Sequence, residues 1–134
     1  MLESLYYVYH REQTKLLKKE ELNLVFECSQ NLKQYQLSEF DYGVHNHYVF
    51  CINEDTQVIG VLIYFFTNEG FIWLSKIYVK PEYRRKKIAS KMFNELLQFN
   101  KSIDLGVDPE NLDSKQFFSS LGLKPVSLVF RKEL

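Results

Sequence analysis

The chain has 134 residues, of which 17 are basic and 17 acidic, and its formal net charge is zero. This length predicts a single domain over residues 1–134 that can bury a core without disulfide or metal staples. The balanced charge disfavours non-specific binding to nucleic acid or to an anionic membrane, so we expect neither as a partner. No apolar stretch reaches the length of a membrane-spanning helix, and the N-terminus lacks a cationic segment followed by an apolar run.

The first third of the chain predicts a strand, a helix and an irregular stretch. Residues 5–9 are apolar and aromatic, as in a strand, and residues 18–32 have the apolar stripe of an amphipathic helix. Residues 36–46 are irregular, with a short helix at 38–42 as one option. Cys28 and Cys51 do not have metal-ligand spacing, and we interpret them as reduced core residues of a cytoplasmic protein.

The middle of the chain predicts an antiparallel meander of three strands. These cover residues 47–53, 56–66 and 71–79, and the turn signals Glu54-Asp55 and Asn68-Glu69-Gly70 separate them. The 11 phenylalanines and 9 tyrosines of the chain favour well-populated strands.

The last third alternates helices and strands. A helix starts at Ile88 and ends near residue 100, and residues 103–107 form a short strand. A second helix starts near Asn111, a favoured N-cap, and ends at Gly122 with Leu123 as the apolar residue of a Schellman motif. Residues 126–131 form the final strand. The resulting fold class is α/β, with a mixed, mostly antiparallel central sheet flanked by helices.

The segment between the third meander strand and the helix at Ile88 has the layout of an anion site. An apolar strand leads into a turn started by Pro81, and four consecutive cations occupy residues 84–87. Backbone N–H groups and the dipole of a helix N-terminus favour a bound anion such as a diphosphate. The same run is also compatible with a solvated turn, or with a contact to nucleic-acid phosphate.

Two motifs in this order resemble the GCN5-related N-acetyltransferase (GNAT) superfamily. Its first signature is a strand ending in Val, then Pro, an aromatic residue and a glycine-rich loop that opens a helix. The matching residues here are Val79, Pro81, Tyr83, Arg84 and Ala89. Its second signature is an Asn, a small residue, an aromatic pair and Gly-Phe. The matching residues here are Asn111, Ser114, Phe117, Phe118, Gly122 and Leu123.

The resemblance implies the GNAT fold and acetyl-CoA as co-substrate for transfer to an amine by direct attack. The strand end at residues 77–79 would offer main-chain groups to the pantetheine arm, and the loop N–H groups would hold the pyrophosphate. The implied cofactor-binding residues are Ile77, Tyr78, Val79, Arg84, Arg85, Lys86, Lys87, Ile88, Ala89, Asn111 and Phe118. The acceptor would be a small-molecule or protein amine, and the chain a monomer or homodimer.

Two residues depart from the family pattern. Lys87 stands where the family has its first glycine, and we expect it to adopt ordinary φ values because it lies at a helix start. Phe118 stands where the family often has a tyrosine that protonates the departing thiolate. Tyr78 and Ser119 are the nearest hydroxyl groups that could substitute for it. The alternative function is therefore an acyl-CoA-binding or regulatory domain without strong catalysis. A less favoured third option is a nucleotide-phosphate binding module of another fold.

The general base is not evident from the sequence. The strand at residues 71–79 contains no carboxylate, and the remaining candidates are Glu39, Asp41, His45, His47 and Glu69. His45 and His47 are the best local pair, because histidine titrates near neutral pH and i, i+2 spacing places both rings on one face of a strand. A structural role for this pair, at a loop or strand edge, is nevertheless the favoured interpretation. A metal site is not expected, since no third ligand lies within sequence reach.

Overall fold

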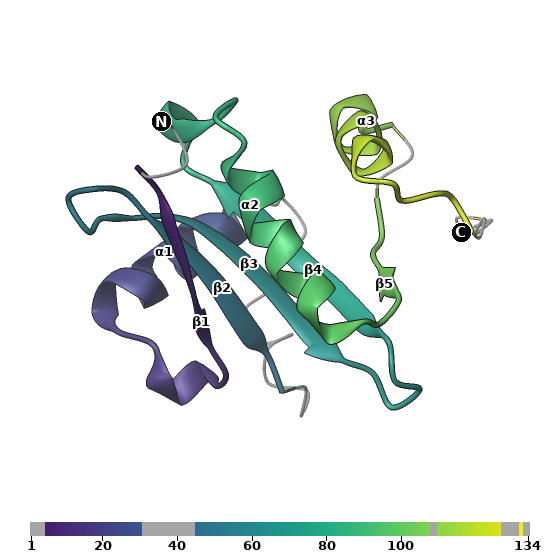
Figure 1. The fold of residues 1–134 in the computed structure, drawn as a ribbon, viewed down its shortest axis with the longest axis horizontal. Helices are drawn as coiled ribbons and strands as arrows, with labels where there is room; N and C mark the ends of the chain where they lie inside the picture. Colours follow the sequence, from purple (N-terminus) through teal and green to yellow (C-terminus); the bar gives the residue numbers. More distant parts are fainter. Residues whose placement is uncertain (1–4, 31–44, 108–109, 127–131, 133–134) are drawn as a thin grey trace.

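The computed structural model describes residues 5–30, 45–107, 110–126 and 132. Its core is a five-stranded sheet with the strands in chain order (Figure 1). Neighbouring strands are antiparallel except for β4 and β5, which are parallel. The strands are β1 (Tyr7–Arg11), β2 (His47–Ile52), β3 (Val58–Phe66), β4 (Ile72–Val79) and β5 (Ile103–Asp104). This mixed, mostly antiparallel sheet flanked by helices confirms the predicted fold class.

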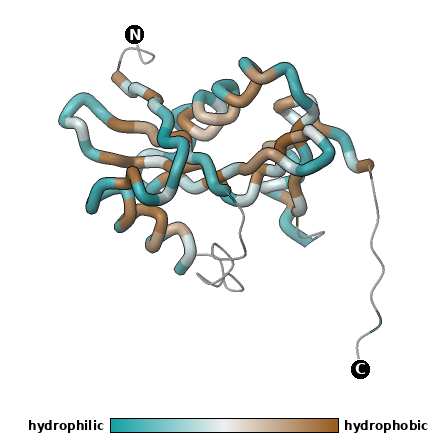
Figure 2. The backbone as a smooth tube through the Cα atoms, turned by 90° about the horizontal axis from the view of Figure 1, so that it is seen from below, coloured by the Kyte–Doolittle hydropathy of each residue, from teal (hydrophilic) through white to brown (hydrophobic). Residues whose placement is uncertain are grey.

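Helices α1 (Lys19–Gln30) and α2 (Ile88–Asn94) cover opposite faces of the sheet, and Figure 2 separates these two layers. Successive side chains along each strand point to opposite layers, as strand geometry requires. In β2, Tyr48 and Phe50 pack toward α1, whereas Val49 and Cys51 pack toward α2. All four side chains are at most 1% exposed, because β2 is an inner strand with a helix on each face.

The side chain of Glu21 caps the start of helix α1. The Glu21 carboxylate accepts a hydrogen bond from the Lys18 backbone N–H at 2.7 Å, in the manner of a capping box. The same carboxylate accepts from the Tyr9 hydroxyl at 2.5 Å and forms an ion pair with Arg11 at 3.3 Å. Glu21 is only 1% exposed, and these donors offset its desolvation. The cap therefore fixes α1 against β1.

Helix α2 lies close to the sheet because β3 offers a glycine beneath it. A Cβ added at Gly60 would meet Met92 Cε at 3.1 Å, and Met92 itself is fully buried. Gly60 pairs with Val79 at the end of β4. This close approach therefore fixes the start of α2 beside the end of β4, where the basic loop connects them.

Most predicted elements are confirmed with shifted ends. The helix predicted to end near residue 100 instead ends at Asn94, and a 3₁₀ segment (Glu95–Phe99) continues it to Asn100, which has a φ of 53°. The strand predicted over residues 103–107 shortens to two residues. Cys28 and Cys51 are free and buried, as expected. The short helix at 38–42 lies outside the described residues, as does the last strand except for Val126, which is not in a strand.

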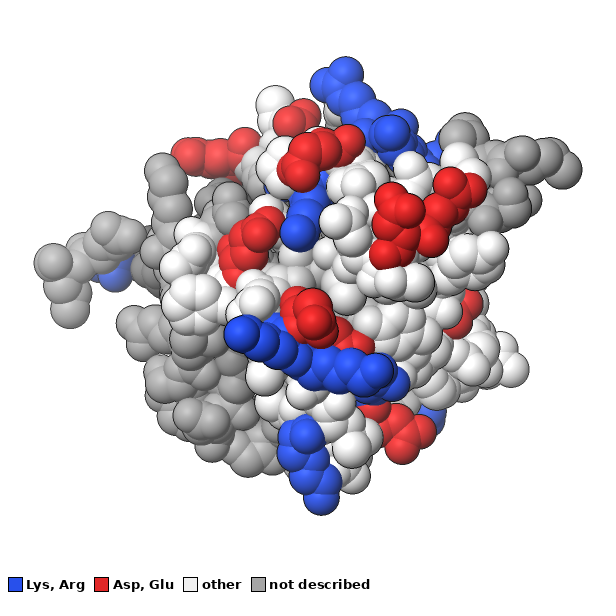
Figure 3. Space-filling model, turned by 90° about the vertical axis from the view of Figure 1, so that its left-hand side faces the viewer, with Lys and Arg blue, Asp and Glu red and all other residues white. Residues whose placement is uncertain are grey.

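Helix α3 (Leu112–Ser120) ends as predicted. The Gly122 N–H donates to the Ser119 carbonyl at 3.0 Å and the Leu123 N–H to the Phe118 carbonyl at 3.1 Å, which is the Schellman pattern. Gly122 has a φ of 93°, a conformation that glycine adopts without strain. Among the described residues, no helix is long and apolar enough to cross a membrane. The face seen in Figure 3 carries acidic and basic side chains intermixed.

Candidate functional site

Strands β4 and β5 diverge soon after they meet. Their parallel pairing covers only Ile72 with Ile103 and Trp73 with Asp104. In β4, the register against β3 shifts so that Ser75 is an extra residue, and such a bulge increases local twist. Beyond it, residues 74–79 have no strand partner on the β5 side within the described chain. We call this side of residues 74–79 the unpaired β4 edge.

The main chain of β4 alternates between β3 and the unpaired β4 edge. The Lys80 N–H donates to the Ile59 carbonyl of β3 at 2.9 Å. Because N–H and C=O directions alternate along a strand, Tyr78 also directs its main chain to β3, and Ile77 and Val79 direct theirs to the open side. Two of the three strand-end residues predicted to bind the cofactor therefore offer main-chain groups to the unpaired β4 edge, and Tyr78 does not.

The basic loop has an unusual backbone. Arg85 and Lys87 have φ values of 64° and 63°, whereas Lys86 between them does not have a positive φ. The expectation of an ordinary φ at Lys87 is therefore wrong: the residue takes the left-handed conformation that its glycine-like position demands, at a steric cost that glycine would avoid. Alternation of φ of this kind turns successive N–H groups toward one side and forms an anion-binding concavity.

The loop and the first turn of α2 leave their N–H groups available. Within the described chain, no backbone acceptor receives the N–H groups of residues 85–90, and the first intrahelical bond runs from Lys91 N–H to the Lys87 carbonyl at 3.0 Å. The Arg84 N–H differs, because it donates to the Pro81 carbonyl at 3.4 Å. The four cationic side chains of residues 84–87 are all exposed. The concavity thus combines free donors, positive charge and a helix start.

Arg84 links the loop to the end of β4. Its Nε donates to the Val79 carbonyl at 2.9 Å, and its guanidinium lies 5.5 Å from the centroid of the Tyr78 ring. Tyr83, in the 3₁₀ turn Pro81–Tyr83, accepts a hydrogen bond from the Asn53 amide at 3.0 Å. The loop is therefore attached to β4 through Arg84 and to the β2–β3 turn through Tyr83.

Helix α3 carries the second motif beyond β5. Its N-cap is Asn111, whose side-chain oxygen accepts from the Ser114 N–H at 3.0 Å, as predicted. Phe118 is half-buried, with its ring centroid 5.0 Å from that of Phe117, and Ser119 is exposed. The side-chain oxygen of Asn111 is thus occupied in capping α3.

Tyr78, a candidate proton donor, points to the α1 face of the sheet. Its hydroxyl donates to Glu27 Oε2 at 2.7 Å, across 51 residues of sequence. Burial, followed by the bond to the Glu27 carboxylate, raises the pKa of Tyr78 to about 12. Glu27 was not among the sequence candidates, since on a helical stripe it looks like an ordinary solvated residue. Only the packing of α1 across the sheet places a carboxylate beside β4, which has none of its own.

His45 and His47 lie together at the other end of the sheet from the basic loop. Their ring centroids are 4.7 Å apart, and the His47 ring stacks on Tyr64 at 5.2 Å. Burial, together with the nearby His45, lowers the pKa of His47. β3 separates their strand from β4, so the structure does not bring them to the unpaired β4 edge. Glu39 and Asp41 lie outside the described residues, and no group of three metal-binding side chains occurs within them.

The sequence matches the acetyltransferase (GNAT) family model over residues 4–123, and the chain belongs to this family. Solved structures with the same fold include the aminoglycoside N-acetyltransferase AAC(6')-Iy in complex with CoA, with a TM-score of 0.72 and 14% identity over 96% of this chain and 94% of that chain. AAC(6')-Ih from Acinetobacter baumannii gives 0.67 and 19%, covering 96% and 99%. The ribosomal-protein-alanine N-acetyltransferase from Brucella melitensis biovar Abortus 2308 gives 0.67 and 14%, also covering 96% and 99%. No curated protein matches the sequence.

Proposed function

We propose that this protein is an acetyl-CoA-dependent N-acetyltransferase that transfers the acetyl group to an amine by direct attack. The observation that carries the proposal is the continuity of the unpaired β4 edge with the basic loop. The main chain of Ile77 and the N–H of Val79 face this edge, and the 3₁₀ turn that follows connects it to the free N–H groups of residues 85–90. An extended pantetheine arm fits an unpaired strand edge, and a pyrophosphate fits a cationic concavity at a helix start.

Each part of the site has a defined role in this proposal. Bound acetyl-CoA supplies an activated thioester whose carbonyl the acceptor amine attacks. The N–H groups of the unpaired β4 edge orient and polarise that carbonyl. The loop residues, Arg85 to Ala89 above all, hold the diphosphate through backbone donors. Arg84 fixes the loop to Val79, and Asn111 and Phe118 would border the arm from α3.

A second candidate function is acyl-CoA binding with weak or no catalysis. The observation that favours it is the ring of Phe118, which has no hydroxyl to protonate a departing thiolate. Two hydroxyl groups were considered as substitutes for that proton donor. The Tyr78 hydroxyl is hydrogen-bonded to Glu27, and Ser119 is exposed on α3. Loss of general acid catalysis lowers the rate roughly 10²- to 10⁴-fold. We expect the low end of this range, because a thiolate is already a good leaving group.

We propose one domain over residues 1–134, acting in the cytoplasm as a monomer or homodimer on a small-molecule or protein amine. Structures related to this fold carry aminoglycoside or ribosomal-protein-alanine acetyltransferase names. Those names support an amine as the acceptor here, and they do not distinguish a small-molecule amine from a protein amine.

Calorimetric titration with acetyl-CoA, followed by thiol release against an amine panel, tests the proposal. We expect one binding site per chain and turnover of at least one amine. Lys86→Ala removes a loop cation and should weaken binding roughly 3- to 10-fold, as for an exposed charge beside a phosphate. Lys101→Ala, which removes an exposed cation outside the loop, should bind as the wild type does. Binding without turnover favours the second candidate, and no binding contradicts both.

A further inference from the structure

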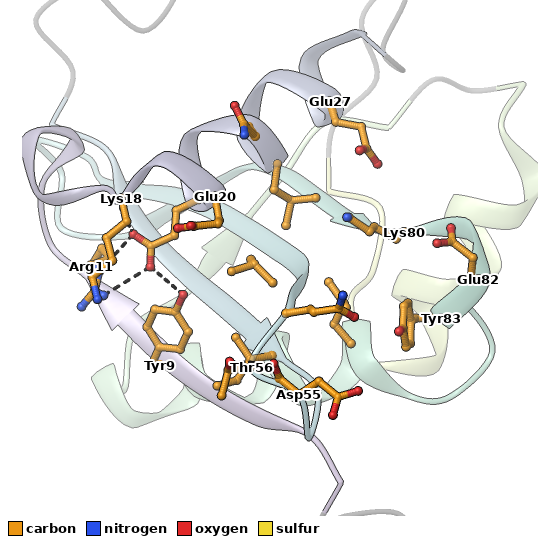
Figure 4. A pocket seen from close by; sticks show the side chains of 17 residues that line it. Tyr9, Arg11, Lys18, Glu20, Glu27, Asp55, Thr56, Lys80, Glu82 and Tyr83 are labelled. Carbon is orange, nitrogen blue, oxygen red and sulfur yellow. Dashed lines mark hydrogen bonds and ion pairs between the residues drawn. The ribbon is translucent and has the colours of Figure 1, made fainter.

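A large cleft lies beside α1 on the face of the sheet opposite α2 (Figure 4). Its volume is about 990 Å³, and its walls come from α1, β1, the turn between β2 and β3, and the 3₁₀ turn before the basic loop. Figure 4 places Arg11, Lys18 and Glu20 at one end, and Glu27, Lys80 and Glu82 at the other. The second end is the one that adjoins β4 and the loop.

Glu27 connects this cleft to the unpaired β4 edge. It lines the cleft from α1, and its carboxylate accepts the Tyr78 hydroxyl at 2.7 Å. Tyr78 is 8% exposed and lies between Ile77 and Val79, the two residues whose main chains face the open side. The Glu27 carboxylate is thus attached to the stretch of β4 along which the proposed function places the thioester arm.

The charges of the cleft favour a cationic ligand. Arg11 pairs with the buried Glu21, and these two charges offset each other. Four other carboxylates line the cleft, against two ammonium groups, those of Lys18 and Lys80. The carboxylates belong to Glu20, Glu27, Asp55 and Glu82. An amine is protonated at neutral pH, so this excess of negative charge attracts the acceptor in its ammonium form. A carboxylate must then remove a proton before the nitrogen can attack.

We propose that Glu27 receives the ammonium group of a cationic acceptor amine and acts as its general base, with Tyr78 as the positioning residue. The inference rests on the proposed function. The ammonium group gives one proton to the Glu27 carboxylate. The neutral nitrogen then forms the C–N bond with its lone pair, the C–S bond breaks, and the thiolate leaves with that electron pair. The extra proton on the amide nitrogen passes to solvent.

Other acidic and basic groups fit this role less well. Glu21 already accepts from Tyr9, Arg11 and the Lys18 N–H, and removing those bonds would disrupt the start of α1. His45 and His47 lie at the opposite end of the sheet. Glu27 combines a position on the cleft wall with a direct bond to β4.

The test compares Glu27→Gln and Tyr78→Phe with the wild type, using the amine from the panel that the wild type acetylates fastest. Glu27→Gln should lower kcat/KM by roughly 10²–10⁴ while acetyl-CoA affinity changes less than about twofold. Its defect should shrink as pH rises toward the pKa of the amine, because the acceptor then arrives neutral. Tyr78→Phe should lower kcat about 10-fold and change its dependence on pH, whereas a smaller folded fraction would lower kcat and leave the pH profile unchanged.

Glu12→Gln is the matched control, since Glu12 is exposed just after β1, outside the cleft. It should retain the wild-type rate and pH profile. An unchanged kcat/KM and pH profile in Glu27→Gln overturns the role of Glu27 and leaves the proposed function intact. Preference for neutral acceptors over cationic amines overturns the acceptor class. Failure of the wild type to acetylate any amine overturns the proposed function as well.

Discussion

Lys87 is a residue at which sequence and backbone conflict, and replacing it with glycine should stabilise the fold. Its φ of 63° places a side chain in the left-handed region. That conformation costs a non-glycine residue roughly 1–2 kcal/mol. Glycine removes this strain but has more freedom in the unfolded chain, which offsets roughly 0.4–1 kcal/mol. Lys87→Gly should therefore stabilise by about 1 kcal/mol, or about 3–5 °C in Tm for a chain of this length.

The assay is thermal and denaturant unfolding of Lys87→Gly beside Lys87→Ala. Alanine removes the same charge and keeps a Cβ in the left-handed region, so it should stay within about 0.5 kcal/mol of the wild type. Equal stability of the two variants would refute the claim that backbone strain at this position matters. Acetyl-CoA affinity gives a second readout: both variants lose the charge, and only glycine allows a closer approach of phosphate to the backbone.

Three further predictions concern other parts of the fold. Burial raises the pKa of Glu21, but its hydrogen bonds and Arg11 outweigh this and hold the pKa below the usual value. The stabilising contribution of Glu21 is therefore fully present at pH values above the usual carboxyl pKa, and it is lost as pH falls through the lowered pKa. Glu21→Gln should lower the free energy of unfolding by about 1–3 kcal/mol at pH 7. In urea titrations it should also flatten the dependence of stability on acid pH. Because the pKa of His47 is lowered in the folded protein, stability should decline as pH falls below about 6.5. His47→Phe should remove this slope of unfolding free energy against pH between about pH 7.5 and 5.5. An unchanged slope would point to another group. Asn111→Ala should cost about 1 kcal/mol through the lost cap to Ser114, whereas Asn111→Ser should retain the cap; equal unfolding midpoints would contradict a capping role.

The sequence predicts the meander and the two motifs because they depend on local signals. Turn residues such as Gly70 and the Asn111 cap specify their own conformations. The end of α2 at Asn94 was missed because the apolar stripe continues through Leu96, which is fully buried within the 3₁₀ segment. Periodicity does not distinguish these two helix types when the same face stays buried.

The candidate site could be predicted only in part. The loop was visible as a run of charges, but the left-handed backbone of Arg85 and Lys87 was not, because neither residue type favours that conformation. Likewise, the bond between Tyr78 and Glu27 depends on how α1 crosses the sheet, which is a matter of packing over 51 residues. Spacing in the sequence carries no information on such a contact.

In the proposed function, backbone donors of the basic loop and the unpaired β4 edge hold acetyl-CoA. Titration of ¹⁵N-labelled protein with acetyl-CoA, followed through the backbone amide resonances, tests it most directly. We expect the largest shifts at the amides of residues 85–90 and of Ile77 and Val79, with small changes in β1 and β2. Saturable binding that shifts amides elsewhere and leaves those of the loop unmoved would contradict it.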